Sequence, residues 1–274
     1  MIRPRLLILP DIHGRRFHCK ALKEAVDNCI DIICLGDYLD PYWGDELHEN
    51  GVFAPLQELV QIKKDNPEHV HLLIGNHDSS YIFDREMCRC RYDYKNAPLY
   101  SNFFRENGDL FEMACLMDIT GKRFLFSHAG ITKRWLDSNK DYFGEDISSP
   151  AKVIKMLDNG YRNFVKDPTQ DAVWTPLAYI GRARGGWHWS GSSIWADVCE
   201  HMQPDASPWG DDVIQIFGHT QQDLHPVRIN ERAYCLDCRQ PFYIDEDGVL
   251  MSYYNDKPIE AINLLSLWGR RPQS

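Results

Sequence analysis

The sequence predicts an α/β fold built around a parallel β-sheet, and three observations support this. Short, mostly apolar runs at 6–9, 31–35 and 70–74 are typical of strands that are buried on both faces. The stretches between these runs carry apolar residues at helical spacing, as amphipathic helices do. Strands that alternate with helices in this way form the parallel sheet of an α/β protein.

The first third of the chain is expected to form two strand–helix units followed by a third strand. Glycine directly follows the second and third apolar runs, where it ends the extended segment. The first helix is expected to end near Asn28. The elements expected here are a strand at 6–9, a helix at 17–26, a strand at 31–35, a helix at 52–64 and a strand at 70–74.

The rest of the chain is expected to be rich in β-structure. Thr120-Gly121 between two apolar stretches is a hairpin signal. The motifs described below extend from residue 11 to residue 219 without a linker, so a single domain over 1–274 is expected, with less regular insertions near 84–110 and 137–209. The further elements expected are a helix at 99–106, hairpin strands at 113–119 and 122–126, a strand at 213–217 and a terminal antiparallel set at 233–236, 242–244 and 249–254.

Composition and charge exclude several classes of function. The formal net charge of -10 argues against a protein that tracks a nucleic-acid backbone. No apolar run approaches the ~18 residues of a membrane span, so no membrane association is expected. Nine cysteines without a secretory signal indicate reduced thiols and a cytoplasmic protein. Cys235 and Cys238 have zinc-type spacing but no second pair, and Cys88 and Cys90 are too close together for a structural zinc site.

Five short polar segments each follow an apolar run, and each presents a carboxylate, an imidazole or an amide. Ligands of open α/β sheets bind outside the carboxyl ends of the strands, so these side chains are expected to converge. The segments are Asp11-Ile12-His13-Gly14, Gly36-Asp37-Tyr38-Leu39-Asp40, Gly75-Asn76-His77-Asp78, His128-Ala129-Gly130 and Gly218-His219-Thr220.

These residue types supply ligands for two metal ions. Asp11 and His13 point the same way at an extended strand end, where a carboxylate oxygen and an imidazole nitrogen can hold one cation. The Asp37 carboxylate, on the neighbouring strand, could bridge two cations. Mixed oxygen and nitrogen ligation suits Mn, Fe or Zn better than Mg, and two adjacent metals activate water against a phosphate ester. The other donors are Asn76, His128 and His219.

In this order the segments resemble the signature of the calcineurin-like metallophosphoesterase family, which reads Asp-x-His, Gly-Asp-x-x-Asp, Gly-Asn-His-[Asp/Glu], His and Gly-His. The chain is most similar to the Ser/Thr phosphoprotein phosphatase branch, including bacterial members and symmetrical diadenosine tetraphosphatases. The stretches 11–14, 127–131 and 235–237 resemble that branch, as does the absence of a second His after His219. The resemblance implies a four-layer αββα fold with two mixed β-sheets sandwiched between helices.

The resemblance also implies a role for each residue. Two ions are expected, with Mn first and Fe or Zn as alternatives, and the nucleophile is a metal-bound water or hydroxide. His77 is the general acid that protonates the leaving oxygen, and Asp40 pairs with it. The first metal is held by Asp11, His13 and Asp37, and the second by Asp37, Asn76, His128 and His219.

One departure from the branch concerns phosphate binding. The branch usually has an arginine directly after the position of Asp40, whereas this chain has Pro41. A stretch from Trp174 to Gly186 loosely resembles the branch's later Trp and Asp-Arg-Gly motifs. It makes Arg184 the candidate clamp, with Arg182 behind it, because a guanidinium suits bidentate phosphate recognition.

The function expected from these observations is hydrolysis of phosphate monoesters on a phosphorylated protein or a small phosphoester, most simply by a phosphoprotein phosphatase. A nucleotide or dinucleoside polyphosphate hydrolase with the same metals is an alternative, and the Trp-rich stretch 174–195 suits it. An inactive binding module of the same fold is a third hypothesis, but such a module should have lost ligands. The acidic balance and the missing second His disfavour a nuclease.

Overall fold

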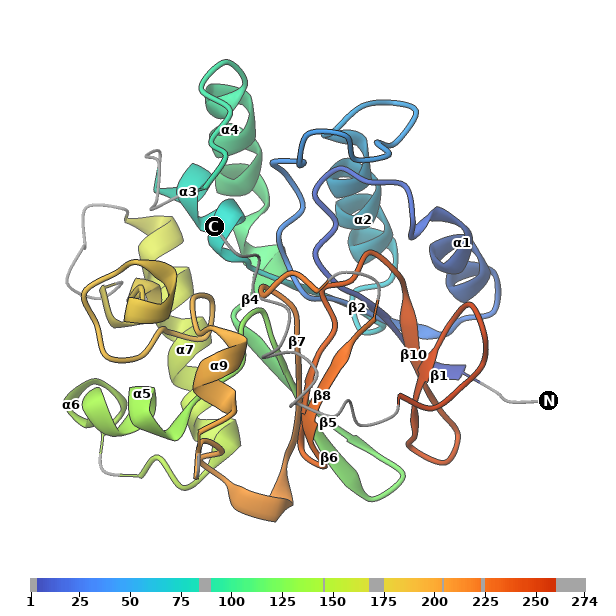
Figure 1. The fold of residues 1–274 in the computed structure, drawn as a ribbon. Coiled ribbons are helices and arrows are strands. Elements are labelled where there is room, and N and C mark those ends of the chain that lie inside the picture. Colours follow the sequence, from blue (N-terminus) through green and yellow to red (C-terminus); the bar gives the residue numbers. More distant parts are fainter. Residues whose placement is uncertain are drawn as a thin grey trace, which may run out of the picture.

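Two β-sheets packed face to face, with helices on their outer faces, form the architecture of the protein (Figure 1). The computed structural model describes residues 4–83, 90–144, 146–167, 175–203, 205–222 and 225–259. Both sheets mix parallel and antiparallel pairs. The four-layer αββα fold implied by the resemblance is therefore confirmed.

The first sheet has six strands in the order β11-β10-β1-β2-β3-β4. β1 to β4 run parallel, and β10 and β11 extend the sheet as an antiparallel pair beside β1. The strands at 6–9, 31–35 and 70–74 were expected, whereas the short β4 was not. The bounds are β1 (Pro4–Leu9), β2 (Asp31–Cys34), β3 (Val70–Leu73), β4 (Phe111–Glu112), β10 (Phe242–Asp245) and β11 (Leu250–Ser252).

The second sheet has five strands in the order β5-β6-β7-β9-β8. The predicted hairpin is confirmed as the antiparallel pair β5–β6. The prediction of one terminal antiparallel set is wrong, because β9 pairs in parallel with β7, while β10 and β11 belong to the first sheet. The bounds are β5 (Ala114–Ile119), β6 (Lys122–Ser127), β7 (Ile214–Phe217), β8 (Val227–Asn230) and β9 (Ala233–Cys235).

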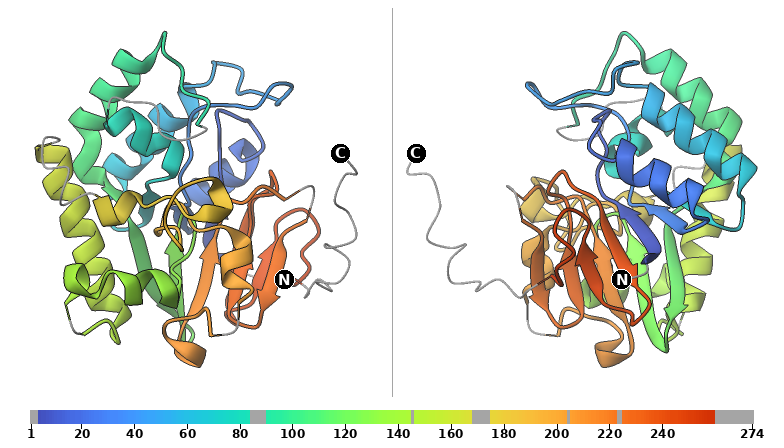
Figure 2. Two further views of the ribbon diagram at one scale, coloured as in Figure 1. Left: turned by 60° about the vertical axis from the view of Figure 1, so that its left-hand side comes forward. Right: turned by 90° about the vertical axis from the view of Figure 1, so that its right-hand side faces the viewer.

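Figures 1 and 2 show α1 and α2 on one side of the strands and α5, α6, α7 and α9 on the other. α7 lies in a stretch expected to be less regular, although its buried residues recur at helical spacing. No helix among the described residues is long and apolar enough to cross a membrane. The helices are α1 (Cys19–Asp27), α2 (Ala54–Asp65), α3 (Asn76–Ile82), α4 (Ala97–Asn107), α5 (Lys133–Ser138), α6 (Lys140–Phe143), α7 (Pro150–Lys166) and α9 (Val198–His201).

The core explains why the strands are apolar on both faces. Alternate residues of β1 point to opposite sides, so Leu6 and Ile8 pack between the sheets while Leu7 and Leu9 pack under the helices. Phe124 and other residues of the second sheet close the layer between the sheets. Strands packed on both faces hold their carboxyl ends in place, and the polar segments begin there.

Candidate metal centre

The polar segments converge at the carboxyl ends of five strands from both sheets. The segments that follow β1, β2 and β3 come from the first sheet, and those that follow β6 and β7 come from the second. All eight predicted metal-binding and acid residues are buried, at 9% exposure or less. They are Asp11, His13, Asp37, Asp40, Asn76, His77, His128 and His219.

Several of these residues adopt a backbone conformation that is uncommon for side chains other than glycine. The φ angle is 48° at His13, 54° at Asp37, 61° at Asp40 and 66° at His219. Each such residue costs on the order of 1–3 kcal/mol, so the surrounding packing must impose it. The Asp11 carboxylate accepts a bond of 3.0 Å from the His219 backbone, and His13 N donates to Asp37 O at 2.7 Å. Backbone strain is therefore concentrated where the side chains converge.

The position of the Asp37 carboxylate is set by the neighbouring motif. Its Oδ1 accepts a hydrogen bond of 2.9 Å from the backbone of His77. The buried Asp78 carboxylate accepts from the backbone N–H groups of Asp37, Tyr38 and Gly75 at 2.8–3.0 Å. A Cβ at Gly75 would lie 2.1 Å from Asp37 Oδ1, so only glycine fits there. In the sequence Asp78 is simply the last residue of the Gly-Asn-His-Asp motif. In the structure its hydrogen bonds join that motif to the segment that follows β2.

The donor atoms around His128 fit a metal ion. Its Nδ1 lies 2.8 Å from the carbonyl of Leu35, which can only accept, so Nδ1 carries the proton. Burial lowers the pKa of His128, so the ring is neutral and Nε2 presents a lone pair. That lone pair faces Asn76 Oδ1 at 2.9 Å, and the Asn76 amide nitrogen donates to Cys90 Sγ. Two acceptors this close repel each other unless a cation lies between them.

A second set of donors meets the first at Asp37. His13 Nδ1 donates to Leu39 O at 2.6 Å, which turns Nε2 toward Asp37 Oδ2 at 3.6 Å. The same carboxylate oxygen lies 3.5 Å from His128 Nε2. Asp37 therefore belongs to two groups whose ligand atoms all lie within 4.8 Å of one another, as a bridging ligand would. These groups are His13, Asp37 and His77, and Asp37, His128 and His219.

Buried carboxylates add negative charge to this centre. Burial, and then the charges of Asp237 and Asp37, raise the pKa of Asp11 well above its usual range. Burial also raises the pKa of Asp237 to about 7, although Arg15 opposes the shift. Carboxylates packed together in this way are stabilised by cations. Asp237 was noted only within the Cys-Leu-Asp segment, and the sequence did not indicate that it lies beside Asp11.

His77 and Asp40 form a hydrogen-bonded pair beside the metal ligands. His77 Nδ1 lies 2.7 Å from Asp40 Oδ2, and the hydroxyl of Tyr81 donates to the other carboxylate oxygen. Because Nδ1 donates to the carboxylate, Nε2 is the ring nitrogen that remains to interact with a substrate. The structure thus brings Asp40 and His77 into the contact that the resemblance implies.

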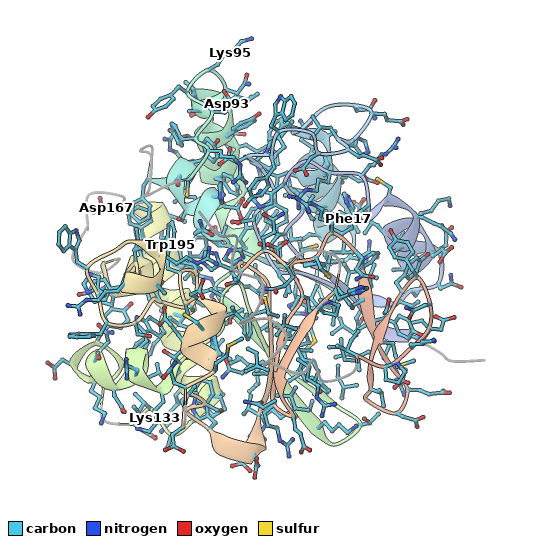
Figure 3. All side chains as sticks on the ribbon, viewed as in Figure 1. Phe17, Asp93, Lys95, Lys133, Asp167 and Trp195 are labelled. Carbon is cyan, nitrogen blue, oxygen red and sulfur yellow. The ribbon has the colours of Figure 1, made fainter. Side chains whose placement is uncertain are left out.

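A cavity of about 210 Å³ opens onto this centre. Trp195, labelled in Figure 3, is one of its walls and packs edge-on against the ring of His219. Five of the eight predicted residues line it, namely His13, Asp37, Asn76, His77 and His219, whereas Asp11, Asp40 and His128 are not among the lining residues. The lining residues outside the eight predicted ones are Tyr42, Arg91, Ala183, Arg184, Trp195 and Asp197.

The two arginines predicted as phosphate clamps lie in different places. Arg184 lines the cavity, where its Nε lies 2.9 Å from Asp197 Oδ2 and its Nη2 donates to Thr220 Oγ1 at 2.7 Å. The guanidinium of Arg182 instead stacks over the ring of Trp189 at 3.5 Å, and Arg182 is not among the lining residues. The structure therefore brings Arg184 to the centre and leaves Arg182 out.

A third arginine, Arg91, lies beside Pro41. The Arg91 guanidinium donates to the carbonyl of Asp40 at 2.7 Å through Nη2 and to that of Pro41 at 3.2 Å through Nε. It also lies over the ring of Tyr42 at 3.3 Å, and it lines the cavity. The phosphatase branch that the sequence resembles usually has an arginine at the position of Pro41. In this chain a guanidinium reaches the same place from a residue 50 positions further along the sequence. No motif in the sequence signals it.

Comparison with known proteins agrees with this geometry. A family model described as calcineurin-like phosphoesterase matches residues 4–223. No curated protein matches the chain. Among solved structures, a cold-active protein-tyrosine phosphatase of a psychrophilic Shewanella species has a TM-score of 0.57 at 12% identity, covering 94% of this chain and 81% of that one. A protein serine/threonine phosphatase from Saccharomyces cerevisiae has a TM-score of 0.51 at 11% identity, covering 87% and 72%.

Proposed function

The chain belongs to the calcineurin-like phosphoesterase family, and we propose that it is a metal-dependent phosphatase that acts on phosphorylated serine and threonine residues of proteins. One observation carries the proposal. Members of both donor groups, His13, Asp37 and His219, line the same cavity as His77, whose ring is paired with Asp40. A phosphoryl group bound in this cavity would lie between the bound metal ions on one side and the proton donor His77 on the other.

The donor chemistry fits two cations, with Mn first and Fe or Zn as alternatives, because nitrogen and oxygen ligands are mixed. Once bound, such ions would stabilise negative charge on the phosphoryl oxygens and activate a water molecule. We assign Asp37 to both ions. Asp11, whose carboxylate lies close enough to Asp37 for their charges to interact, and His13 complete one set, and Asn76, His128 and His219 complete the other.

The remaining groups act on the substrate itself. His77 carries the proton that the leaving oxygen requires, and Asp40 holds its ring in position. Arg184 and Arg91 bind phosphoryl oxygens, because both guanidinium groups line the cavity and are fixed by hydrogen bonds of their own. A fixed guanidinium loses less entropy on binding than a mobile one.

The size of the cavity supports a phosphoprotein substrate. Its volume of about 210 Å³ is below the ~300–1,000 Å³ that sites for drug-sized ligands occupy. A phosphoryl group and a short side chain fit, and the rest of the polypeptide would lie on the surface. The exposed side chains of Trp43 and Trp187, each close in sequence to a lining residue, offer apolar contact area there.

The same tryptophans favour a second candidate, hydrolysis of a nucleotide or dinucleoside polyphosphate, because an exposed indole can stack on a base. The Trp189 ring is less suited, since Arg182 covers it. The third hypothesis, an inactive binding module, lacks support, because the donor atoms converge and His77 is paired with Asp40.

A substrate panel tests the proposal. Phosphoserine, phosphothreonine and phosphotyrosine peptides, nucleotides and dinucleoside polyphosphates are assayed with Mn²⁺, each against a metal-stripped control. We expect the highest kcat/KM for phosphoserine and phosphothreonine peptides and no turnover without metal. Preference for dinucleoside polyphosphates would replace the proposal with the second candidate. Metal-independent turnover would contradict the assignment of the centre.

Substitution of the arginines should separate substrate binding from chemistry. Arg91→Ala and Arg184→Ala are each expected to raise KM for phosphopeptides, because a hydrogen bond to a charged group contributes about 1.5–3 kcal/mol, or roughly 10- to 100-fold. Arg182→Ala is the matched control and should leave KM unchanged, since its guanidinium stacks on Trp189. Steady-state kinetics on a phosphoserine peptide measures all three.

Metal content is determined in parallel, because Arg184 also donates to the backbone carbonyl of His219. An equal KM effect from Arg182→Ala, or wild-type KM in both other variants, would place the phosphate clamp elsewhere. The variant Arg91→Lys adds a further comparison. A lysine keeps the charge but not the planar fork, so only part of the binding should return.

A further inference from the structure

A third group of side chains with metal-ligand chemistry lies outside the cavity, where the two sheets meet. His71 comes from β3, Glu112 from β4 and Cys115 from β5, and their ligand atoms all lie within 4.8 Å of one another. None of the three is among the residues that line the cavity. They are not part of the centre built on Asp37, and no step proposed above uses them.

The distances within this group match the ligand shell of a tetrahedral ion. His71 Nδ1 lies 3.2 Å from Glu112 Oε2 and 3.5 Å from Cys115 Sγ. Zinc bonds of about 2.0–2.1 Å to nitrogen or oxygen and about 2.3 Å to sulfur separate tetrahedral ligand atoms by roughly 3.3–3.6 Å. A hydrogen bond from His71 to Glu112 and a hydrogen bond between His71 and Cys115 each account for one of these distances. A single bound cation accounts for both distances and draws all three side chains to one point.

The surroundings of the Cys115 thiol disfavour its charged form. Burial, and then the charges of Glu112 and Asp158, hold the pKa of Cys115 well above its usual range. Lys63 is the cation that opposes this shift, but its Nζ donates to Pro67 O at 2.7 Å. A divalent ion would displace the thiol proton to solvent. The charges of one thiolate and one carboxylate would then balance the ion.

The location of this group suggests what such an ion would do. β4 ends at Glu112 and β5 begins at Ala114, so the chain passes from the first sheet to the second at Met113. Both strands are green in Figure 1. An ion held by His71 and Glu112 of one sheet and Cys115 of the other would cross-link the sheets at this passage.

We propose that His71, Glu112 and Cys115 form a further cation site, which takes Zn²⁺ or another thiophilic divalent transition metal and ties the two sheets together. Imidazole, carboxylate and thiolate together favour zinc over Mg²⁺ or Ca²⁺. The fourth position is open to water, because the side chains of His71 and Glu112 are 23% and 21% exposed. The site is structural and is independent of the proposed substrate.

Cobalt substitution of the full chain tests this site. The donors assigned to the Asp37 centre are oxygen and nitrogen, so a near-ultraviolet thiolate-to-Co²⁺ charge-transfer band would report a cysteine ligand. We expect the band in the wild type, kept reduced with a phosphine that does not chelate metal. Cys115→Ser should abolish the band and lower the metal content by one ion per chain. It should keep Mn²⁺-dependent phosphatase activity. With Mn²⁺ already saturating the Asp37 centre, added Zn²⁺ should raise Tm more in the wild type than in Cys115→Ser.

Two further cysteine variants identify the thiolate. Cys29→Ser, at an exposed position, should keep the band. Cys90 is the alternative source, since its Sγ lies 3.4 Å from the Asn76 amide nitrogen. A band that survives Cys115→Ser and disappears in Cys90→Ser would overturn the proposal, as would a wild type with neither the band nor a Zn²⁺-dependent Tm. If Cys115→Ser does not fold, His71→Gln, at a half-buried position, gives the same comparison. An unchanged charge-transfer band in His71→Gln would also overturn the proposal.

Discussion

Replacing Asp37 with asparagine is expected to abolish turnover and to empty both positions of the metal centre. The Asp37 carboxylate belongs to both donor groups, and no other ligand is shared between them. Burial opposes its ionisation, whereas the backbone N–H of His77 donates to this carboxylate and lowers its pKa. Metal ions contribute several kcal/mol of charge stabilisation to such reactions, so the loss should be roughly 10³-fold or more. Elemental analysis and kcat on a phosphoserine peptide measure the two effects.

Asp31→Asn is the matched control for this substitution. Asp31 begins the same strand, β2, but its side chain is 48% exposed and pairs with His69 at the opposite end from the centre. We expect that variant to keep both metal content and activity. An Asp37→Asn protein that retains two ions per chain would contradict the bridging assignment, because an amide oxygen is a weaker ligand than a carboxylate.

Replacing His77 with asparagine should have the second largest effect, and the effect should depend on the leaving group. General acid catalysis contributes typically 10²–10⁴-fold, so we expect a loss of about that size on a phosphoserine peptide. An aryl phosphate, whose leaving oxygen needs less protonation, should lose much less. Rates across a series of leaving-group pKa values show the difference as a steeper dependence in the variant.

The ring of His77 packs edge-on against that of His13 at 5.0 Å, so its loss could disturb a metal ligand. The metal content of His77→Asn must therefore equal that of the wild type if the loss of activity is to be assigned to the missing acid. Asp40→Asn should follow the same leaving-group pattern with a smaller loss, since Asp40 acts through His77. His69→Asn, at an exposed position, serves as the control. Equal losses on alkyl and aryl substrates, or loss of metal, would argue that His77 is a ligand and not the acid.

Much of the fold and most of the centre were predicted from local patterns. The apolar runs that form β1, β2 and β3 are buried on both faces, so each can be recognised as a strand from its own residues alone. The metal-binding segments could be found for the same reason. Asp11 and Asp37 lie within a few residues of the strands that position them.

The failures share a different cause. β4 has only two residues, and β8 reads Val-Arg-Ile-Asn, so neither forms a continuous apolar run. β9 looked like a partner of β10, yet it pairs with β7 in the other sheet. Packing between the two sheets decides which strand β9 pairs with. Leu236, the residue after β9, belongs to the buried cluster that residues of both sheets form there. The buried residues of α7 recur at helical spacing, so this helix lies within reach of a prediction from sequence.

By itself the sequence was enough to predict the candidate metal centre, because each predicted ligand lies next to the strand that places it, and the order of the segments along the chain groups them into one set. Only the tertiary structure decided what surrounds that centre. It placed Arg91 against the backbone of Pro41, left Arg182 on Trp189, and joined His71 to Cys115 across two sheets. These contacts link residues far apart in the chain. Their physical origin is the packing of whole layers, which no short stretch of sequence encodes.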